Sequence, residues 1–352
     1  MDFSAYQGCL AHLCAKPEQA EREDWEGLQD DDRCYYAVDP YQLDLVKILG
    51  SKALARLIDK TQVFFRRNNP HIRTRDRHTH DTAQVATLIA ITGLNKDLML
   101  SGAFGHDIGH LPFGHNGETA LGNILGKEIS HATVAVVLAR RVERKGVGLN
   151  LTTQTLEIIL NHSSGAGRVR PVHGITQEAA AVMWADKAYV FADASDFRRC
   201  LQDSEPKLVA EIDRLAGQFG CNQREQVSRY VYELVAESAE AGKISFEASE
   251  WAQRFAEFKS WLYSEVYPTR VMRSTLIEGL YRAHDLLGTC PEFADCDKSL
   301  LLALLTDSEA WQLIEMALDH RKLSVEQISH FGITEIYKHL QGVELDLTDP
   351  WA

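Results

Sequence analysis

Histidines and carboxylates gather in one part of this 352-residue chain. Of its fourteen histidines, seven fall between residues 78 and 162: His78, His80, His106, His110, His115, His131 and His162. The densest stretch runs from Gly105 to Glu118 and reads Gly-His-Asp-Ile-Gly-His-Leu-Pro-Phe-Gly-His-Asn-Gly-Glu. Imidazole nitrogens and carboxylate oxygens together form a ligand set that suits manganese, iron, cobalt, nickel or zinc. The pattern therefore indicates a site for a divalent metal.

A complete metal site needs ligands from more than one segment of the chain. His106 and Asp107 supply one nitrogen and one oxygen from a single helix end. The candidates for the remaining ligands are a histidine on the preceding helix and an acid on a later helix. His78 and Asp186 fit those places.

The same stretch has a competing interpretation as the helical HExxH motif of a zinc protease. That motif needs a continuous helix, which places both histidines on one face. Gly105, Gly109 and Pro112 oppose such a helix, and an aspartate stands where the protease needs its glutamate base. We therefore favour a metal site whose ligands come from several segments of the chain.

Positive charge is concentrated just before the histidines. The formal net charge is −13, which disfavours nonspecific binding to nucleic acid or to an anionic membrane. Five arginines nevertheless fall within twelve residues: Arg66, Arg67, Arg73, Arg75 and Arg77. A solvated loop is the ordinary interpretation of such a run. Its closeness to the histidines favours the binding of an anionic substrate instead.

Long stretches of the chain have helical periodicity, and clean alternation with a period of two is scarce. In 82–92, Val85, Ala86, Leu88 and Ile89 form one apolar stripe. Similar stripes occur in 132–142, 177–197, 207–216, 226–241, 250–263, 274–287 and 299–318. We expect an all-α fold with loops at 144–151 and 163–175. The Ser-Ser-Gly-Ala-Gly run in the second loop lacks the lysine and the preceding strand of a P-loop.

Composition is that of an ordinary soluble globular protein, with 45% hydrophobic residues. No apolar run is long enough for a membrane span, and the amino terminus does not read as a secretory signal, so we expect a cytoplasmic protein. The seven cysteines are scattered without a CxxC pair, which predicts buried free thiols. The five isolated histidines, namely His173, His284, His320, His330 and His339, are expected to be structural.

Three separated blocks resemble the dGTP triphosphohydrolases of the HD superfamily. They are ALARLIDKTQVF at 53–64, RTRDRHTHD at 73–81 and HDIGHLPFGHNGE at 106–118. The likeness is clear over about residues 50–200 and faint again around residues 261–267. It implies an HD-domain helical bundle with an additional C-terminal helical region. We expect a variable N-terminal region at 1–45, the HD-domain catalytic core at 46–200 and the C-terminal helical region, packed on the core, at 201–352.

The resemblance implies a metal set of four residues: His78, His106, Asp107 and Asp186. Alignment on the Arg73–Arg75 block selects His78 over His80 as the first ligand, with His80 as its neighbour. Manganese is the expected ion, with magnesium, iron, cobalt, nickel or zinc as alternatives.

The resemblance also implies roles around the substrate. His115 is expected to act as the general acid and Glu118 to orient it, although the opposite role, in which His115 activates the nucleophile, stays open. The expected substrate contacts are Gln62, Arg75, His110, His131, Lys187, Tyr189 and Asp193, and His110 is also a catalytic candidate. Gln62 has a helix-surface glutamine as its alternative interpretation. His162 is a further candidate for a second metal or a phosphate contact. The spacing departs from the family, because Asp186 stands three residues before Tyr189 where the family has four.

The implied reaction is metal-dependent hydrolysis of dGTP, or of deoxynucleoside triphosphates in general, to deoxynucleoside and tripolyphosphate. A nucleotidase or phosphodiesterase of the wider HD superfamily is one alternative, and a non-catalytic dNTP-sensing module is another. The family also implies a homo-oligomer with a nucleotide or single-stranded DNA as effector. Ala55 departs from the family at the first arginine of its first block, which weakens the inference on assembly.

Overall fold

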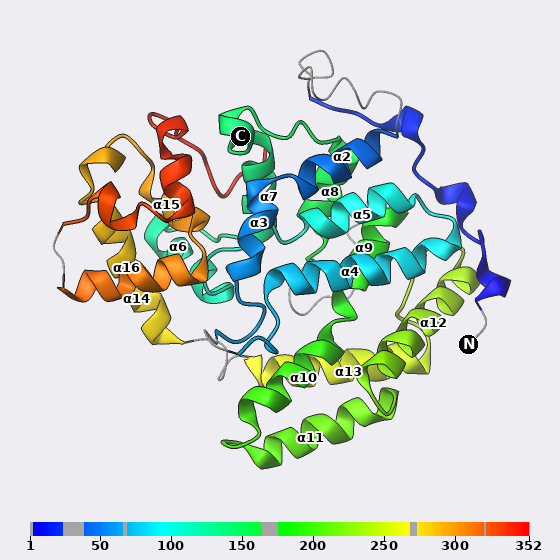
Figure 1. Ribbon diagram of the computed structural model, residues 1–352. Coiled ribbons are helices and arrows are strands. Elements are labelled where there is room, and N and C mark those ends of the chain that lie inside the picture. The colour runs from blue at the N-terminus through cyan, green and yellow to red at the C-terminus, as the bar shows by residue number, and fades with distance from the viewer. Residues whose placement is uncertain are drawn as a thin grey trace. The chain divides into compact units, whose positions relative to one another are not determined.

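The computed structural model describes residues 3–23, 39–65, 69–163, 175–267, 273–319 and 322–351. Within these ranges the chain forms helices and two isolated β-bridges but no strand (Figure 1). The all-α prediction is therefore confirmed. Several residues singled out from the sequence lie outside the described ranges: Arg66, Arg67, Cys34, His173, His320 and most of the predicted loop at 163–175.

The helices belong to two compact units that interleave along the chain. Unit 1 comprises Met1–Val46, His78–Phe104 and Thr152–Val271, and unit 2 comprises Lys47–Arg77, Gly105–Leu151 and Met272–Ala352. Helices α2 (Pro40–Leu49) and α4 (Arg75–Ile89) begin in one unit and end in the other. The division into regions at residues 45 and 200 stays a prediction.

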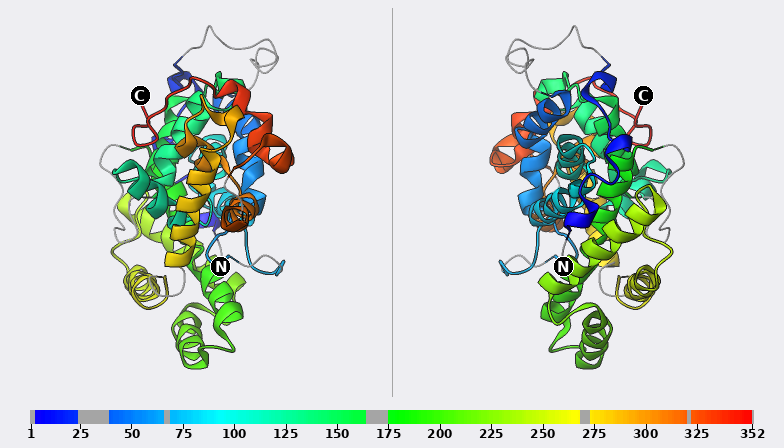
Figure 2. Two further views of the ribbon diagram at one scale, coloured as in Figure 1. Left: turned by 90° about the vertical axis from the view of Figure 1, so that its left-hand side faces the viewer. Right: turned by 90° about the vertical axis from the view of Figure 1, so that its right-hand side faces the viewer.

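Unit 1 is built from pairs of packed helices around an aromatic core. Its helices are α5 (Lys96–Gly105), α8 (Thr153–Asn161), α9 (Gln177–Lys187), α10 (Val190–Leu201), α11 (Pro206–Ala216), α12 (Gln223–Ala241) and α13 (Glu250–Glu265). Helix α8 packs on α9, and α10 packs on both α11 and α12. Figure 2 shows the α10–α11 pair in green at the lower end of both views. Phe191, Tyr230 and Phe255 lie within ring-contact distance in the core.

Unit 2 is organised around α14 (Ser274–Leu287), which contacts α6 (His115–Leu125), α15 (Lys298–Leu304) and α16 (Asp307–Asp319) (Figure 1). Helices α3 (Lys52–Ala55) and α7 (His131–Arg141) complete the unit. Leucines of α14 and α15 join Leu121 and Val134 in one buried cluster. This core holds in place the ends of α6 and α7, where the chemically interesting side chains lie.

Side-chain caps explain where several of these helices begin. Ser130, Thr152, Thr176 and Ser249 each accept a hydrogen bond from a backbone N–H two or three residues further on. Such caps satisfy donors that have no partner within the helix. The sequence predicted the helices after Ser130, Thr176 and Ser249, and they are present, whereas α8 after Thr152 was not predicted.

Two long predicted helices are each broken into two. The predicted helix 177–197 is interrupted at Ala188 and Tyr189, between α9 and α10. The predicted helix 299–318 is interrupted at Leu305, whose backbone is extended, between α15 and α16. Apolar periodicity continues through both breaks because each pair of helices shares one core. Leu88 also differs from the prediction, since it is exposed while Val85 and Ile89 are buried.

The composition-based predictions have a mixed outcome. No described helix is both long and apolar enough to cross a membrane. The six described cysteines are free thiols, and Cys290 and Cys296 are buried. Cys221 is exposed, so the prediction that the thiols are buried is wrong for this residue.

Candidate metal and phosphate site

The histidine-rich stretch is a tight non-helical connection between two helices. Helix α5 ends at Gly105, residues 106–114 form turns, and α6 begins at His115. This geometry confirms that the stretch is not the continuous helix of a zinc protease. A Cβ atom on Gly109 would lie 2.1 Å from the Ala135 nitrogen and 2.3 Å from the His131 oxygen. Glycine therefore lets the backbone of α7 approach the turn and bring His131 to it.

Asp107 lies at the centre of the cluster in unit 2. The side chain is 1% exposed, and its Oδ2 accepts a hydrogen bond from the Arg75 guanidinium at 2.9 Å. The Nε2 atoms of His106, His110 and His131 lie 3.5, 3.2 and 3.8 Å from its oxygens. Burial alone would raise the pKa of Asp107, but Arg75 and the neighbouring imidazoles hold it well below its ordinary value. The carboxylate is therefore ionised and ready to act as a ligand.

His110 and His131 form a stacked pair of rings with different charge states. Their centroids lie 3.9 Å apart with an interplanar angle of 15°. Burial lowers the pKa of His110 far below its ordinary value, and Arg75 and His131 lower it further, so its ring is neutral. Burial also acts to lower the pKa of His131, but the carboxylate of Glu118 outweighs it and the pKa is raised. The protonated form is thus favoured at His131 alone.

Glu118 makes its hydrogen bonds with His131. Its Oε1 lies 2.6 Å from the His131 Nδ1 and accepts the His131 backbone N–H at 2.8 Å. Its Oε2 lies 3.9 Å from the Nε2 of His115, the partner expected from the sequence. Burial would raise the pKa of Glu118, yet His131 holds it well below the ordinary value. Glu118 is therefore an ionised partner that is shared between the two histidines, and His131 is the closer.

Arg75 is mainly engaged with the protein. Its Nε donates to the Thr61 oxygen at 3.1 Å, one terminal nitrogen to the Gln62 oxygen at 3.2 Å, and the other to Asp107. A guanidinium has five N–H donors, so these three bonds leave two for a ligand. Arg75 thus positions Asp107 and the 61–62 segment, a role that the sequence did not predict.

His115 follows a strained turn. The non-glycine residue Phe113 has a φ of 59°, a left-handed conformation that costs energy unless its surroundings enforce it. Gly114 follows with φ 60° and ψ −127°, which only glycine adopts readily. His115 is then the first residue of α6, and its side chain is 52% exposed. An imidazole so exposed beside buried charges is accessible to a substrate.

Unit 1 carries the other predicted ligands as a pair. The His78 Nε2 lies 3.0 Å from the Asp186 Oδ1, and the ring of Tyr189 meets the His78 ring edge-on at 5.3 Å. His78 is buried, whereas His80 two residues on is exposed and packs edge-on against Phe104. His78, the residue selected as a ligand, is therefore the histidine of the two that is buried beside a carboxylate.

Two lysines of unit 1 lie close to Asp186. Burial and the nearby positive charge of Lys259 together lower the pKa of Lys187 to about 8. The Lys187 ammonium lies 4.9 Å from the Trp184 ring centre and makes no hydrogen bond to any described residue. Lys259 on α13, whose pKa burial also lowers, was missed from the sequence. A lone lysine in an amphipathic helix gives no signal of function.

An aromatic series on α13 reaches another predicted residue. The Tyr263 and Tyr267 rings stack at 4.5 Å, and the Tyr267 hydroxyl donates a hydrogen bond to the Asp193 carboxylate. Asp193 is buried, as is Tyr189 four residues earlier on the chain. The sequence had indicated only a faint likeness around residues 261–267.

Comparison with known proteins places these observations in a family. The HD domain family profile matches residues 75–189. A deoxyguanosinetriphosphate triphosphohydrolase-like protein of Clostridium tetani is 31% identical over 265 residues, which cover 73% of this chain and 74% of that protein. The equivalent protein of Desulfatibacillum aliphaticivorans is 33% identical, with 68% and 69% covered, and that of Clostridium perfringens strain 13 is 36% identical, with 64% and 67% covered. This chain belongs to the deoxyguanosinetriphosphate triphosphohydrolase-like family.

The donor sets of this family member fit a divalent metal. In unit 2, ligand atoms of Asp107, His110 and His131 all lie within 4.8 Å of one another, although His131 could bind an ion only after losing the proton that Glu118 favours. In unit 1, His78 and Asp186 pair a nitrogen with an oxygen. Mixed nitrogen and oxygen donors suit first-row divalent ions, and the ionised state of Asp107 meets the requirement that ligands be deprotonated.

Two further residues predicted from the family resemblance have definite surroundings. Gln62 lies outside the helices, after the short 3-10 helix at Arg56–Asp59, so its helix-surface interpretation is wrong. Its Oε1 is buried without a hydrogen-bond partner among the described residues. His162 follows α8, and its Nδ1 lies 2.7 Å from the Ile159 oxygen. That contact is typical of a helix end, with one ring nitrogen already used.

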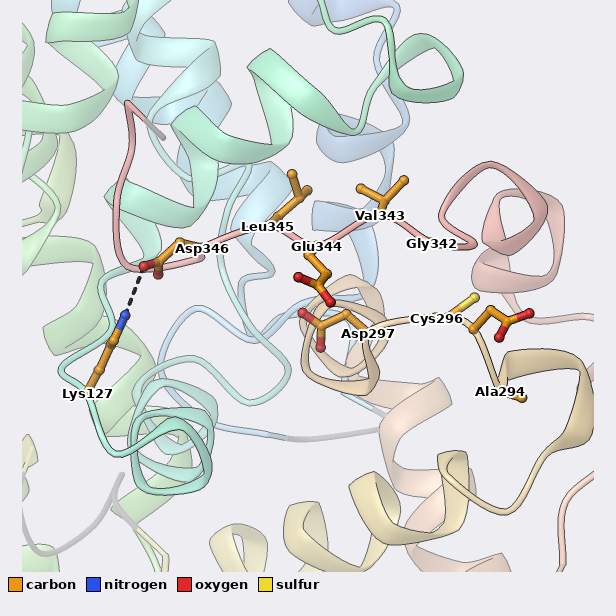
Figure 3. A pocket seen from close by; sticks show the side chains of 10 residues that line it. Lys127, Ala294, Cys296, Asp297, Gly342, Val343, Glu344, Leu345 and Asp346 are labelled. Atoms are coloured by element: carbon orange, nitrogen blue, oxygen red, sulfur yellow. Dashed lines mark hydrogen bonds and ion pairs between the residues drawn. The ribbon is translucent and has the colours of Figure 1, made fainter.

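A cavity of about 690 Å³ lies elsewhere in unit 2 of this family member. It is lined by residues of 294–297 and 342–346 together with Lys127, and the histidine cluster does not contribute to it. Figure 3 shows the Asp297 and Glu344 carboxylates pointing toward each other, while Lys127 pairs with Asp346 at 2.9 Å. Asp297 also caps α15. The acidic lining repels anions, so the cavity does not suit a triphosphate.

Proposed function

We propose that this protein hydrolyses deoxynucleoside triphosphates at the α-phosphorus, with deoxynucleoside and tripolyphosphate as products. Its membership of the deoxyguanosinetriphosphate triphosphohydrolase-like family supports the substrate class. The single structural observation that carries the proposal is the buried, ionised Asp107, held by Arg75 and flanked by three imidazoles. Such a group is suited to bind a divalent metal.

The proposed metal set is His78, His106, Asp107 and Asp186. The pairing of His78 with Asp186 in unit 1 and of His106 with Asp107 in unit 2 supports it. When bound, a divalent ion at these residues would polarise an α-phosphate oxygen and favour a nucleophilic water. We propose Mn²⁺ as the ion, on the basis of the family resemblance.

Positive groups would neutralise the triphosphate. His131 is held in its protonated form by Glu118, and Arg75 keeps two N–H donors. Lys187 is a buried ammonium without a hydrogen-bond partner among the described residues, so an anion would satisfy it. Lys259 adds a further charge near Lys187. Fixed cations in a buried setting bind phosphate more strongly than they would in water.

His115 would protonate the leaving group. Attack of water at the α-phosphorus breaks the bond to the 5′-oxygen, which leaves poorly as an alkoxide. The exposed His115 ring donates a proton to that oxygen. The attacking water loses one proton, so the number of protons is unchanged over the reaction. Burial lowers the pKa of His115, and the negative charge of Glu118, 3.9 Å away, opposes that shift. Neutral His110, buried beside Asp107, would donate its single N–H to a phosphate oxygen.

The remaining contacts would hold the sugar and base. Gln62, with its buried and unpartnered oxygen, is suited to the 3′-hydroxyl. Tyr189 and Asp193 would contact the sugar, since Tyr189 lies against the His78 ring and Tyr267 orients Asp193. A homo-oligomer, a nucleotide or single-stranded DNA effector and a cytoplasmic location stay predictions.

Product analysis tests the proposal. The purified protein is incubated with each of the four dNTPs and Mn²⁺, with and without a chelator, and the products are separated by ion exchange. We expect tripolyphosphate and deoxynucleoside in equal amounts, and none after chelation. Release of inorganic phosphate, or turnover of monophosphates or cyclic nucleotides, would instead favour a nucleotidase or phosphodiesterase. Tight dNTP binding without any product would indicate a sensing module.

A further inference from the structure

Asp307 is a buried carboxylate that binds two segments of unit 2 from a third. It is the first residue of α16, and its side chain is 2% exposed. Its Oδ2 accepts the Thr61 backbone N–H at 2.9 Å and also the Thr61 hydroxyl. Its Oδ1 accepts the Phe113 backbone N–H at 2.8 Å. Three donors from two distant parts of the chain therefore converge on this one carboxylate.

The start of α16 leaves Asp307 available for these contacts. A carboxylate in the first turn of a helix often caps the N–H groups of its own helix. Here Thr306 and Glu309 cap the helix instead. The Glu309 Oε2 accepts the Thr306 N–H at 2.8 Å, and the Thr306 hydroxyl accepts the Glu309 N–H at 3.4 Å. Ser308 donates to Asp59 at 2.8 Å, which fixes the orientation of the helix start. The Asp307 side chain is thus directed away from its own helix.

Each segment that Asp307 binds leads directly to a proposed site residue. Thr61 accepts the Nε–H of Arg75, and the other end of the Arg75 guanidinium holds Asp107. Phe113 is the residue with left-handed φ, and His115 follows it by two positions. A Cβ atom on Gly114 would lie 3.6 Å from an Arg75 terminal nitrogen, so the turn before His115 also lies close to the Arg75 side chain. The position of His115 relative to Arg75 is therefore set through Asp307.

Lys60 reinforces the same arrangement. It is buried, and its ammonium donates to the His110 backbone oxygen and to the Ala303 oxygen at 3.4 Å. It lies one residue before Thr61. Burial raises the pKa of Asp307, and the donors from Thr61 and Phe113 and the positive charge of Lys60 oppose this rise, which leaves the pKa at about 6. An isolated buried carboxylate is strongly destabilised by desolvation, so this one must be compensated by its donors and by Lys60.

We propose that Asp307 is a positioning residue for the hydrolysis: it fixes the turn that aims His115 and the segment that anchors Arg75, without contacting the substrate. This inference rests on the proposed function. It predicts that loss of Asp307 lowers the rate of the chemical step more than it weakens substrate or metal binding. A misplacement of about 1 Å in a reacting group is enough to cost about 100-fold in rate.

The test compares isosteric variants with matched controls. Asp307→Asn has only one acceptor oxygen, so an amide N–H must face an N–H donor in either orientation. Thr61→Val removes only the hydroxyl donor, and Thr61→Ser retains it. Asp319→Asn makes the same chemical change at the exposed last residue of α16. Steady-state kinetics with a dNTP, Mn²⁺ titration and hydrogen–deuterium exchange of residues 111–118 are measured for each.

For Asp307→Asn we expect kcat to fall about 10- to 100-fold with KM changed less than about threefold. Exchange in 111–118 should increase, and Mn²⁺ affinity should stay near the wild-type value. Thr61→Val should lower kcat in the same direction, while Thr61→Ser and Asp319→Asn should match wild type. If Asp307→Asn does not fold, the Thr61 pair decides: equal kcat for Val and Ser overturns the inference.

Failure of the inference is distinguishable from failure of the proposed function. A folded Asp307→Asn variant with wild-type kcat overturns the positioning role while leaving the proposed hydrolysis intact. An inactive wild-type protein overturns the proposed hydrolysis. In that case unchanged exchange of residues 111–118 in Asp307→Asn would also reject the structural link, because that measurement needs no turnover.

Discussion

The carboxylate of Glu118 binds His131 twice, through the Nδ1 of its ring at 2.6 Å and through its backbone N–H at 2.8 Å. The two residues stand thirteen apart, at the starts of α6 and α7. One carboxylate thus sets both the position and the charge of His131. Glu118 thereby connects α6, which begins with His115, to the His131 ring, which stacks on His110.

This pair predicts a pH-dependent contribution to stability in the metal-free protein. The pKa of His131 is raised above its ordinary 6.5, so its contribution is complete below 6.5 and is lost as pH rises through the folded value. The pKa of Glu118 is lowered from 4.5, so its contribution is present above 4.5 and is lost on acidification. The stabilisation by the pair is therefore largest between about pH 4.5 and 6.5.

Glu118→Gln should consequently lower the free energy of unfolding by about 2 kcal/mol near pH 6, and by less at pH 9. Urea unfolding in the presence of a chelator measures the difference at each pH. Glu128→Gln, at an exposed residue three before His131, serves as the control and should show no such dependence. A difference that is constant from pH 5 to pH 9 would contradict the assigned charge states.

Metal binding should depend on His78 and not on His80. His78→Ala and Asp186→Asn each remove one member of the 3.0 Å pair in unit 1, and both should lose at least about 100-fold in activity together with bound Mn²⁺. His80→Ala removes an exposed ring that packs on Phe104 and should keep its metal. Metal content by mass spectrometry after dialysis decides between them. A metal-free His80→Ala protein beside a metal-loaded His78→Ala protein would reverse the ligand assignment.

The role of His115 as acid predicts a dependence on the leaving group. His115→Ala should lower kcat for a dNTP about 100- to 10,000-fold, because the 5′-oxygen would leave unprotonated. A p-nitrophenyl ester of the α-phosphate needs no proton on its leaving group, so its hydrolysis should lose much less. Parallel kinetics with the two substrates check this expectation. An equal loss with both would assign His115 to activation of the nucleophile.

Gly109→Ala should disrupt the packing of α7 on the turn at 106–114. The new methyl group would meet the backbone of Ala135 at 2.1 Å and of His131 at 2.3 Å, and backbone cannot move aside cheaply. We expect destabilisation by about 3 kcal/mol, measured by thermal unfolding. Gly217→Ala is the control, since that site has φ −61° and open space around it. Its stability should be unchanged or higher by up to about 1 kcal/mol, and an equal loss in both variants would contradict the packing argument.

The features that local sequence patterns determine could be predicted from the sequence. Apolar periodicity indicated α4, α7 and the helices from α9 onward, but not α2, α5, α6 or α8. Gly105, Gly109 and Pro112 indicated that the histidine-rich stretch is not helical. The break before α16 also had a local signal, because Thr306 and Glu309 form a capping pattern inside the apolar run. Periodicity outweighed it, so one helix was predicted in place of two.

Contacts between residues far apart in the sequence could not be predicted from local sequence patterns. The nearest histidine in sequence, His115, was taken as the partner of Glu118, while the fold brings His131 closer. Arg75 was expected to bind phosphate, yet most of its contacts hold Asp107 and the 61–62 segment. Asp307 lies about 200 residues from the turn that it holds. Spacing along the chain contains no information on such partners.

Hydrolysis in ¹⁸O-labelled water tests the central claim most directly. With a dNTP and Mn²⁺, attack of water at the α-phosphorus must place one ¹⁸O atom in tripolyphosphate and none in the deoxynucleoside. Mass spectrometry of the two separated products from the wild-type protein reads this out in a single experiment. Label in the deoxynucleoside, or label in inorganic phosphate with dNDP as the other product, would contradict the account.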